Sequence, residues 1–215
     1  MYIVERGLRF VRGFILSYGP TNIKKIFWDK EYSGDKWNFA DNTVGDCVYG
    51  PLEKFAANKT ILDIGCGSGN TPTEMAGNYK SYVGVDISKT ALAKAAKRSQ
   101  DIGRGNKNSF ECSDFLTYVP SQPYDVILFR ESLYHVPISK IKPTLDRYAT
   151  YLKEGGVFIV RLFAGDRETD QSKPRPTAML ASIEADFDVL EKGVYPEDKG
   201  LPTVIVFRPK VLVKH

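Results

Sequence analysis

The sequence is poor in the side chains that form disulfides and metal sites. It has only three cysteines and two histidines among 215 residues. The cysteines are odd in number and widely spaced, at Cys47, Cys66 and Cys112, which suits neither a disulfide framework nor a zinc site. We therefore expect no bound metal and a reducing compartment, with the cytoplasm as the default location.

Long apolar runs and a one-sided charge are also missing. The longest apolar stretches are the size of strands, well short of the roughly 20 residues that cross a bilayer. The 30 basic and 26 acidic residues leave a net charge of +4, and the basic ones are scattered, which disfavours nucleic acid as a partner. We expect a small molecule as the partner, and the oligomeric state stays open.

The first 58 residues differ from the rest. They are rich in aromatic side chains and show no alternation of strands and helices, so we interpret 1–58 as an accessory or lid segment and 59–215 as one globular domain. Residues 1–18 mix three arginines with apolar side chains but lack a signal-peptide core and cleavage site. An arm packed on its own domain is favoured there over an amphipathic helix on acidic lipid, and both interpretations stay open.

From residue 60 onward, short apolar runs alternate with helical patterns, which is typical of a parallel sheet covered on both faces. Strands are expected at 60–64, 81–85, 108–112, 124–129, 157–162, 187–190 and 203–207. Helices are expected to begin at a capping box over 71–74, to span 89–100 behind a Ser88 cap, to run from 138 to 152 until Gly155-Gly156, and to span 177–185. A loop is expected at 164–176. The fold class is α/β, with a doubly wound, mostly parallel seven-stranded sheet.

The segment that indicates chemistry is the glycine-rich turn Gly65-Cys66-Gly67-Ser68-Gly69 after the first strand. Glycines at this place permit a tight turn and let the backbone approach a ligand closely. A nicotinamide fingerprint needs its third glycine three residues after the second, and here it comes two after, which disfavours pyrophosphate binding. Asp86 ends the next strand about 20 residues later, where a carboxylate reaches ribose hydroxyls. The pattern favours a nucleoside ligand.

Three segments together resemble a known family. Residues 62–69 (LDIGCGSG), residues 83–88 (VGVDIS) and Ser113-Asp114 occur in the order and on the elements seen in class I S-adenosylmethionine-dependent methyltransferases. The resemblance covers residues 60 to about 209. It implies S-adenosylmethionine as the cofactor and an antiparallel last strand.

The resemblance also implies cofactor-binding roles at the ends of the first three strands, for Asp63, Gly65, Gly67, Gly69, Asp86, Ile87, Asp114 and Phe115. The three glycines would form the loop under the methionine and ribose, and Asp63 would orient the methionine ammonium through backbone or water. Asp86 would accept both ribose hydroxyls. Asp114 would accept the exocyclic amine of adenine, with Ile87 and Phe115 as apolar walls on the ring faces.

The fourth strand leads into residues 129–137, FRESLYHVP. In this family the fourth strand lies beside the first, so its end would face the transferred methyl group. His135, with an ordinary pKa near 6.5, could take the proton of a hydroxyl acceptor, and Glu131 could serve instead or orient an acceptor amine. Arg130 is assigned to the cofactor and could instead bind an acidic group of the acceptor. The structural alternatives are local hydrogen bonding by His135 and an Arg130–Glu131 ion pair.

The combined prediction is a methyltransferase acting on a small molecule, with a hydroxyl of the sugar or natural-product type preferred over an amine. Residues 130–133 read Arg-Glu-Ser-Leu, not the Asn/Asp-Pro-Pro-aromatic tetrad, which argues against planar base or glutamine nitrogens. Two alternatives stay open. One is a nicotinamide-dependent oxidoreductase on a similar sheet, and the other is an S-adenosylmethionine-binding partner module without catalysis.

Overall fold

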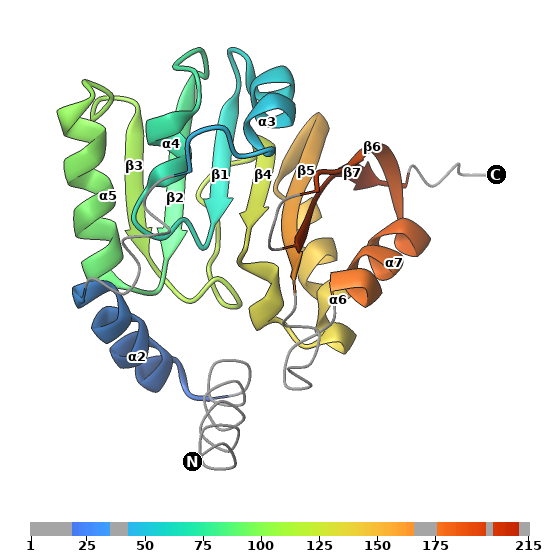
Figure 1. Ribbon diagram of the computed structural model, residues 1–215, viewed down its shortest axis with the longest axis horizontal. Coiled ribbons are helices and arrows are strands. Elements are labelled where there is room, and N and C mark those ends of the chain that lie inside the picture. Colours follow the sequence, from blue (N-terminus) through green and yellow to red (C-terminus); the bar gives the residue numbers. More distant parts are fainter. Residues whose placement is uncertain (1–18, 35–42, 166–175, 197–199, 211–215) are drawn as a thin grey trace.

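The structure is a computed structural model that describes residues 19–34, 43–165, 176–196 and 200–210. Seven strands form one sheet in the order β3-β2-β1-β4-β5-β7-β6 (Figure 1). The strands are β1 Thr60–Ile64, β2 Ser81–Asp86, β3 Asn108–Cys112, β4 Tyr124–Arg130, β5 Leu152–Gly165, β6 Phe187–Val194 and β7 Gly200–Pro209. The expectations for residues 1–18 and for most of the 164–176 loop fall outside the described residues.

The first five strands pair in parallel, whereas β7 pairs antiparallel with both β5 and β6. This confirms the doubly wound sheet and its antiparallel last strand. The strand order reverses at β1 and β4, and in open sheets of this kind ligands bind outside the carboxyl ends of the strands at that point.

Helices cover both faces of the sheet. They are α2 Thr21–Ser33, α3 Tyr49–Ala56, α4 Asn70–Glu74, α5 Lys89–Asp101, α6 Ile138–Ala149 and α7 Pro176–Asp186, with a short 3-10 helix, η2, at Leu133–His135. Alternate residues of β4 point into two separate cores. Ile127 packs on one face with α6 and α7, and Val126 packs on the other with Leu52 of α3. The central strands are therefore buried on both sides, which explains their near-continuous apolar sequences.

Two sequence predictions for the helices need correction. The capping box at 71–74 is wrong, because α4 already begins at Asn70 and its N-cap is Gly69 with φ of 80°. The helix expected up to 152 ends at Ala149, because Leu152 instead pairs with Tyr124 as the first residue of β5. Gly155 therefore lies inside a strand. The Ser88 cap is confirmed, since its Oγ accepts a hydrogen bond of 3.1 Å from the Ala91 N–H.

The 164–176 loop also differs at its two ends. Ala164 and Gly165 pair with Leu201 and Gly200, so β5 continues beyond the predicted strand end. Pro176 is the first residue of α7, where its fixed φ and missing N–H are tolerated.

The N-terminal segment contributes two helices to the described structure. Leu52 and Ala56 of α3 are fully buried against the sheet. The helix α2 lies across the carboxyl ends of β2 and β3, beside the start of α5 (Figure 1). The accessory segment therefore reaches the edge where the ligand is expected, and the domain boundary at residue 58 stays a prediction.

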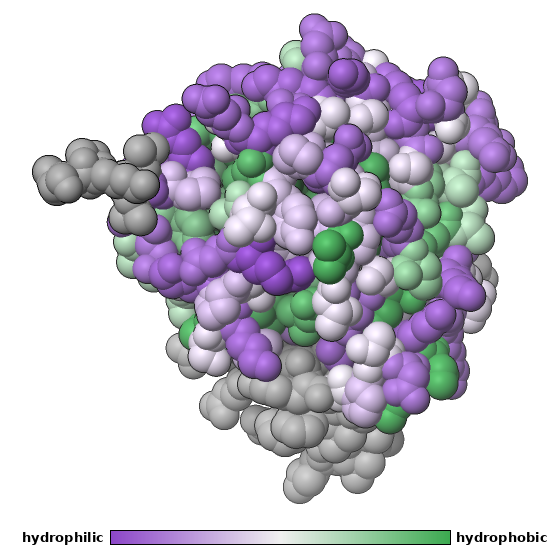
Figure 2. Space-filling model, turned by 180° about the vertical axis from the view of Figure 1, so that it is seen from behind, coloured by the Kyte–Doolittle hydropathy of each residue, from purple (hydrophilic) through white to green (hydrophobic). Residues whose placement is uncertain are grey.

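The molecular surface opposite the view of Figure 1 is mainly hydrophilic over the coloured residues, with small separate apolar areas (Figure 2). Among the described residues, no helix combines the length and the apolar character needed to cross a membrane.

Candidate active site

The glycine turn after β1 has the backbone geometry that the sequence predicts. Gly65, Gly67 and Gly69 have φ of 78°, 55° and 80°, in the left-handed region where other residues are strained. A Cβ on Gly65 would lie 2.5 Å from the Cβ of Ser132, and one on Gly69 would lie 2.7 Å from the Cβ of Ala95. The turn thus packs directly against the segment that follows β4 and against α5.

Asp86 joins the glycine turn to the start of α5. Its Oδ2 accepts the Gly67 N–H at 2.9 Å and its Oδ1 accepts the Ser88 N–H at 2.9 Å. An ionised carboxylate offers about four lone-pair positions, so two remain for ligand hydroxyls. Burial raises the pKa of Asp86, and the backbone donors act in the opposite direction.

Asp63 lies at the centre of the sheet, between Gly84 of β2 and Leu128 of β4. Its side chain is fully buried, and its Oδ2 accepts a hydrogen bond of 2.7 Å from the Tyr82 hydroxyl. Burial raises its pKa to about 6. The nearby Thr71 hydroxyl lowers the pKa of Asp63, but no well-aligned hydrogen bond reaches Oδ1 among the described residues. An orphaned buried carboxylate oxygen is costly, which fits a group that serves a bound cation.

Asp114 is buried at the end of β3 and already has partners. Its Oδ1 accepts the Leu116 N–H at 3.0 Å, and its Oδ2 accepts the Thr21 hydroxyl of α2 at 2.9 Å. The Lys24 Nζ, also from α2, lies 3.7 Å from Oδ2. No sequence pattern predicts that α2 reaches this carboxylate.

The two residues predicted as apolar walls lie one position after the acidic ones. Ile87 is half-buried between Asp86 and the Ser88 cap. Phe115 is half-buried and packs on the α6 side of the core, while its carbonyl accepts hydrogen bonds of 2.6 Å from Arg147 and from the Tyr148 hydroxyl. The loop after β3 is therefore held rigidly, and the contact of both side chains with adenine stays a prediction.

A network of four charges occupies the carboxyl ends of β4 and β5. Arg130 and Arg161 are direct neighbours in the sheet. Arg130 Nη2 donates to Asp46 Oδ2 at 2.7 Å, and Arg161 lies between Asp46, at 3.4 Å from Nε to Oδ1, and Glu131, at 2.6 Å from Nη1 to Oε1. The suggested Arg130–Glu131 ion pair is therefore wrong. Arg130 pairs with Asp46 and Glu131 pairs with Arg161, because β4 ends at Arg130 and the chain turns at Glu131.

This network shifts the pKa values of both acids. Burial pushes the pKa of Asp46 upward, but Arg130 and Arg161 outweigh it, so the pKa lies below its ordinary value. Burial raises the pKa of Glu131 in spite of Arg161. Glu131 also has φ of 55°, one of two non-glycine residues with positive φ in the described chain. Such strain persists where the surroundings enforce it and often marks functional positions.

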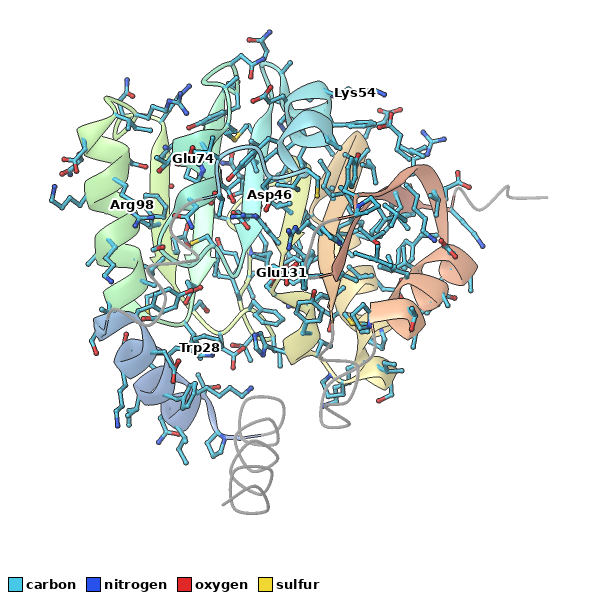
Figure 3. The ribbon with its side chains drawn as sticks, viewed as in Figure 1. Trp28, Asp46, Lys54, Glu74, Arg98 and Glu131 are labelled. Atoms are coloured by element: carbon cyan, nitrogen blue, oxygen red, sulfur yellow. The ribbon has the colours of Figure 1, made fainter. Side chains whose placement is uncertain are left out.

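His135 ends the short helix η2 and faces α2. Its imidazole meets the Trp28 indole edge to face, with 5.3 Å between the ring centroids. Figure 3 shows Trp28 pointing from α2 toward the segment after β4, on the same side of the molecule as Glu131. Both predicted catalytic residues therefore lie at the carboxyl edge of β4.

The structure adds site residues that no motif marked. They are Thr21, Lys24, Trp28, Asp29, Tyr32 and Asp46. Thr21, Asp29 and Asp46 each form a hydrogen bond with a residue 59 to 93 positions away, namely Asp114, Ser88 and Arg130. The aromatic richness of the first 58 residues was the single sequence signal.

A family model described as a methyltransferase domain matches residues 49–185, well over half of the chain. The chain belongs to the methyltransferase-domain family. This confirms the resemblance to class I S-adenosylmethionine-dependent methyltransferases, and the match begins at α3 and ends at α7.

Similar proteins agree with the family. The chain is 31% identical over 113 residues to a probable thiol methyltransferase 2 of Arabidopsis thaliana, covering 52% of the chain and 50% of that protein. It is 37% identical over 79 residues to a trans-aconitate 2-methyltransferase of Streptomyces avermitilis, covering 36% and 29%. The chain thus spans half or less of these curated relatives.

Among solved structures, the N-methyltransferase NodS of Bradyrhizobium japonicum, in complex with S-adenosyl-L-homocysteine, superposes with a TM-score of 0.70. The match covers 86% of this chain and 97% of NodS at 19% identity. At that identity the likeness supports the methyltransferase fold alone.

Proposed function

We propose that this chain transfers the methyl group of S-adenosylmethionine to a small-molecule acceptor, and to a hydroxyl in preference to an amine. The observation that carries the proposal is the row of carboxylates at the ends of adjacent strands. Asp63 is the second-last residue of β1, Asp86 is the last residue of β2 and Asp114 comes two residues after β3. The left-handed glycine turn lies between the first two in the sequence. A positively charged amino acid end, a ribose and an adenine require acceptors in this order.

The residues of the turn suit this cofactor. Asp86 has two lone-pair positions left for the ribose hydroxyls after binding Gly67 and Ser88. Asp63 supplies negative charge below the turn, where its orphaned Oδ1 favours an ammonium group through backbone or water. When bound, the cofactor supplies a methyl group that is electrophilic because it is carried on a sulfonium.

The acceptor is assigned to the segment after β4. We assign to His135 the role of accepting the proton of the attacking hydroxyl, because its ordinary pKa lies near neutral pH. Glu131 would orient a donor group of the acceptor, held in place by Arg161. Arg130 is already neutralised by Asp46, so binding of an anionic group at Arg130 would compete with that pair.

The names of the relatives cover several kinds of acceptor, namely a thiol, trans-aconitate and, for NodS, a nitrogen atom. The hydroxyl preference therefore rests on His135 alone. We place the reaction in the cytoplasm on the basis of three free, widely spaced cysteines.

A label-transfer screen tests this proposal. The chain is incubated with S-adenosylmethionine carrying a labelled methyl group and with matched panels of small hydroxyl, amine, thiol and carboxylate compounds. Label in hydroxyl compounds, with one S-adenosylhomocysteine formed per methyl transferred, is the expected result. Label confined to amines would overturn the hydroxyl preference. Cofactor binding without transfer to any panel would favour a non-catalytic binding module.

A further inference from the structure

The helix α2 contacts the groups that the proposed function assigns to the cofactor. At the end of β3, the Thr21 hydroxyl donates to Asp114 Oδ2 at 2.9 Å, and the buried Lys24 places its ammonium 3.7 Å from the same oxygen. The Thr21 hydroxyl and the Lys24 ammonium therefore compete for the oxygen that the adenine amine would use. Both side chains come from the same face of α2, because residues three apart in a helix are neighbours.

The other end of α2 covers the glycine turn. The Tyr32 hydroxyl oxygen lies 2.7 Å from the position that a Cβ would take on Gly67. A glycine with φ of 55° allows close approach from that direction, and here the group that approaches is a tyrosine hydroxyl. A ligand cannot pack on this side of Gly67 while the Tyr32 hydroxyl is there.

A third contact holds α2 in place, and it lies outside the positions predicted for the ligand. Asp29 Oδ1 accepts the Ser88 hydroxyl at 2.8 Å and the Thr90 N–H at 3.0 Å, at the first turn of α5. A carboxylate at a helix N-terminus is favourable because the helix dipole and the unpaired N–H groups attract it. This contact can persist when Thr21, Lys24 and Tyr32 give up theirs.

We infer that α2 is a built-in competitor of the cofactor, and that Thr21, Lys24 and Tyr32 set the affinity of the site for an adenosine-bearing ligand. The inference rests on the proposed function. Binding of the ligand exchanges the Thr21 and Lys24 contacts of Asp114 for the adenine amine, and moves the Tyr32 hydroxyl away from Gly67. The observed affinity is then the intrinsic affinity reduced by the free energy of releasing α2.

Calorimetric titration with S-adenosylhomocysteine tests the competition. Thr21→Val, Lys24→Met and Tyr32→Phe each remove one polar contact and keep most of the side-chain volume. Each variant should bind about three- to tenfold more tightly than the unchanged chain. Lys30→Ala, at an exposed position of the same helix, is the matched control and should leave the affinity unchanged.

If α2 helps to bind the cofactor, the three variants should bind it more weakly. If α2 completed the cofactor site, the same three variants would bind S-adenosylhomocysteine more weakly, and that outcome, or unchanged affinity in all three, overturns the inference. Absence of binding by every variant, with the fold intact by circular dichroism, contradicts the proposed function itself and the inference with it.

Trp28 provides an independent readout, because it lies between α2 and His135. The chain has two tryptophans, so a Trp37→Phe background leaves Trp28 as the single emitter. Titration with S-adenosylhomocysteine should change its fluorescence, with a midpoint equal to the calorimetric Kd. Binding heat without any change in Trp28 emission would mean that α2 stays in place, which contradicts the competition.

Discussion

Asp46 accepts a hydrogen bond of 2.7 Å from Arg130, joining the chain just before α3 to the carboxyl end of β4. Arg161 approaches the same carboxylate, with 3.4 Å between its Nε and Asp46 Oδ1. All three side chains are buried or nearly so, with 7 to 14% of their surface exposed. Asp46 therefore contacts two guanidinium groups at the edge of the site, and Arg161 pairs with Glu131 as well.

Replacement of Asp46 should destabilise the protein. Asp46→Ala leaves both guanidinium groups buried without this partner, which should lower the free energy of unfolding by about 3 kcal/mol. Urea unfolding followed by circular dichroism measures the loss. The matched control is Asp188→Ala. Asp188 and its partner Arg208 are both about half exposed, so the free energy of unfolding should fall by less than about 0.5 kcal/mol. Equal losses for the two variants would show that the Asp46 network contributes no special stability.

Asp63 should make stability depend on pH. Burial raises its pKa from 3.8 to about 6, so the folded state binds the proton more tightly than the unfolded state does. Stability is therefore lost as pH rises from about 4 to about 6, and at about 1.4 kcal/mol for each pH unit the loss is roughly 3 kcal/mol.

Asp63→Asn removes this charge and keeps an acceptor for Tyr82. The variant should be more stable than the unchanged chain by up to about 3 kcal/mol at pH 8, and the difference should vanish near pH 4. Urea unfolding of both proteins at pH 4, 6 and 8 provides the comparison. A difference in the free energy of unfolding that does not vary with pH would contradict the raised pKa of Asp63.

Asp86→Ala should abolish tight cofactor binding. The variant loses two hydrogen bonds between a carboxylate and the ribose hydroxyls, each worth about 1.5–3 kcal/mol, so the Kd for S-adenosylhomocysteine should rise at least about 100-fold. Calorimetry measures the Kd, with Asp101→Ala at the exposed end of α5 as control. Unchanged affinity in the Asp86 variant would discredit the ribose assignment.

His135→Ala should affect turnover far more than binding. With an acceptor found in the label-transfer screen, kcat should fall about 100-fold, because general-base help is commonly worth about 10²- to 10⁴-fold. The Kd for S-adenosylhomocysteine should stay within a few-fold. The other histidine supplies the control, His215→Ala, which should leave kcat unchanged. Equal turnover in both variants would remove His135 from the mechanism.

The sheet could be predicted because the patterns that indicate its strands lie within short stretches of sequence. The strand at 60–64 is an apolar run, and its glycine turn and Asp86 follow at short, recognisable spacings. The helical pattern from 138 predicts a helix up to 152, because Leu152 continues the period, whereas pairing with Tyr124 assigns Leu152 to β5. Pairing with a distant strand therefore determines the secondary structure of Leu152, which the local periodicity leaves ambiguous.

The role of α2 and of Asp46 could not be predicted because their partners are distant in the chain. Thr21 and Asp114 are 93 residues apart, and Asp46 and Arg130 are 84 apart. No spacing rule relates such pairs. Arg130 and Glu131 are adjacent in the sequence, which suggests a pair, but β4 ends at Arg130 and the chain turns at Glu131 with φ of 55°, so the two side chains have different partners.

Calorimetric titration with S-adenosylhomocysteine and, in parallel, with NAD tests the central claim most directly. The carboxylates at the carboxyl ends of β1 and β2 and after β3, together with the glycine turn, predict saturable binding of S-adenosylhomocysteine. They predict no measurable binding of NAD, which carries a pyrophosphate that this turn is not suited to accept. Binding of NAD without binding of S-adenosylhomocysteine would contradict the assignment of this chain as a methyltransferase.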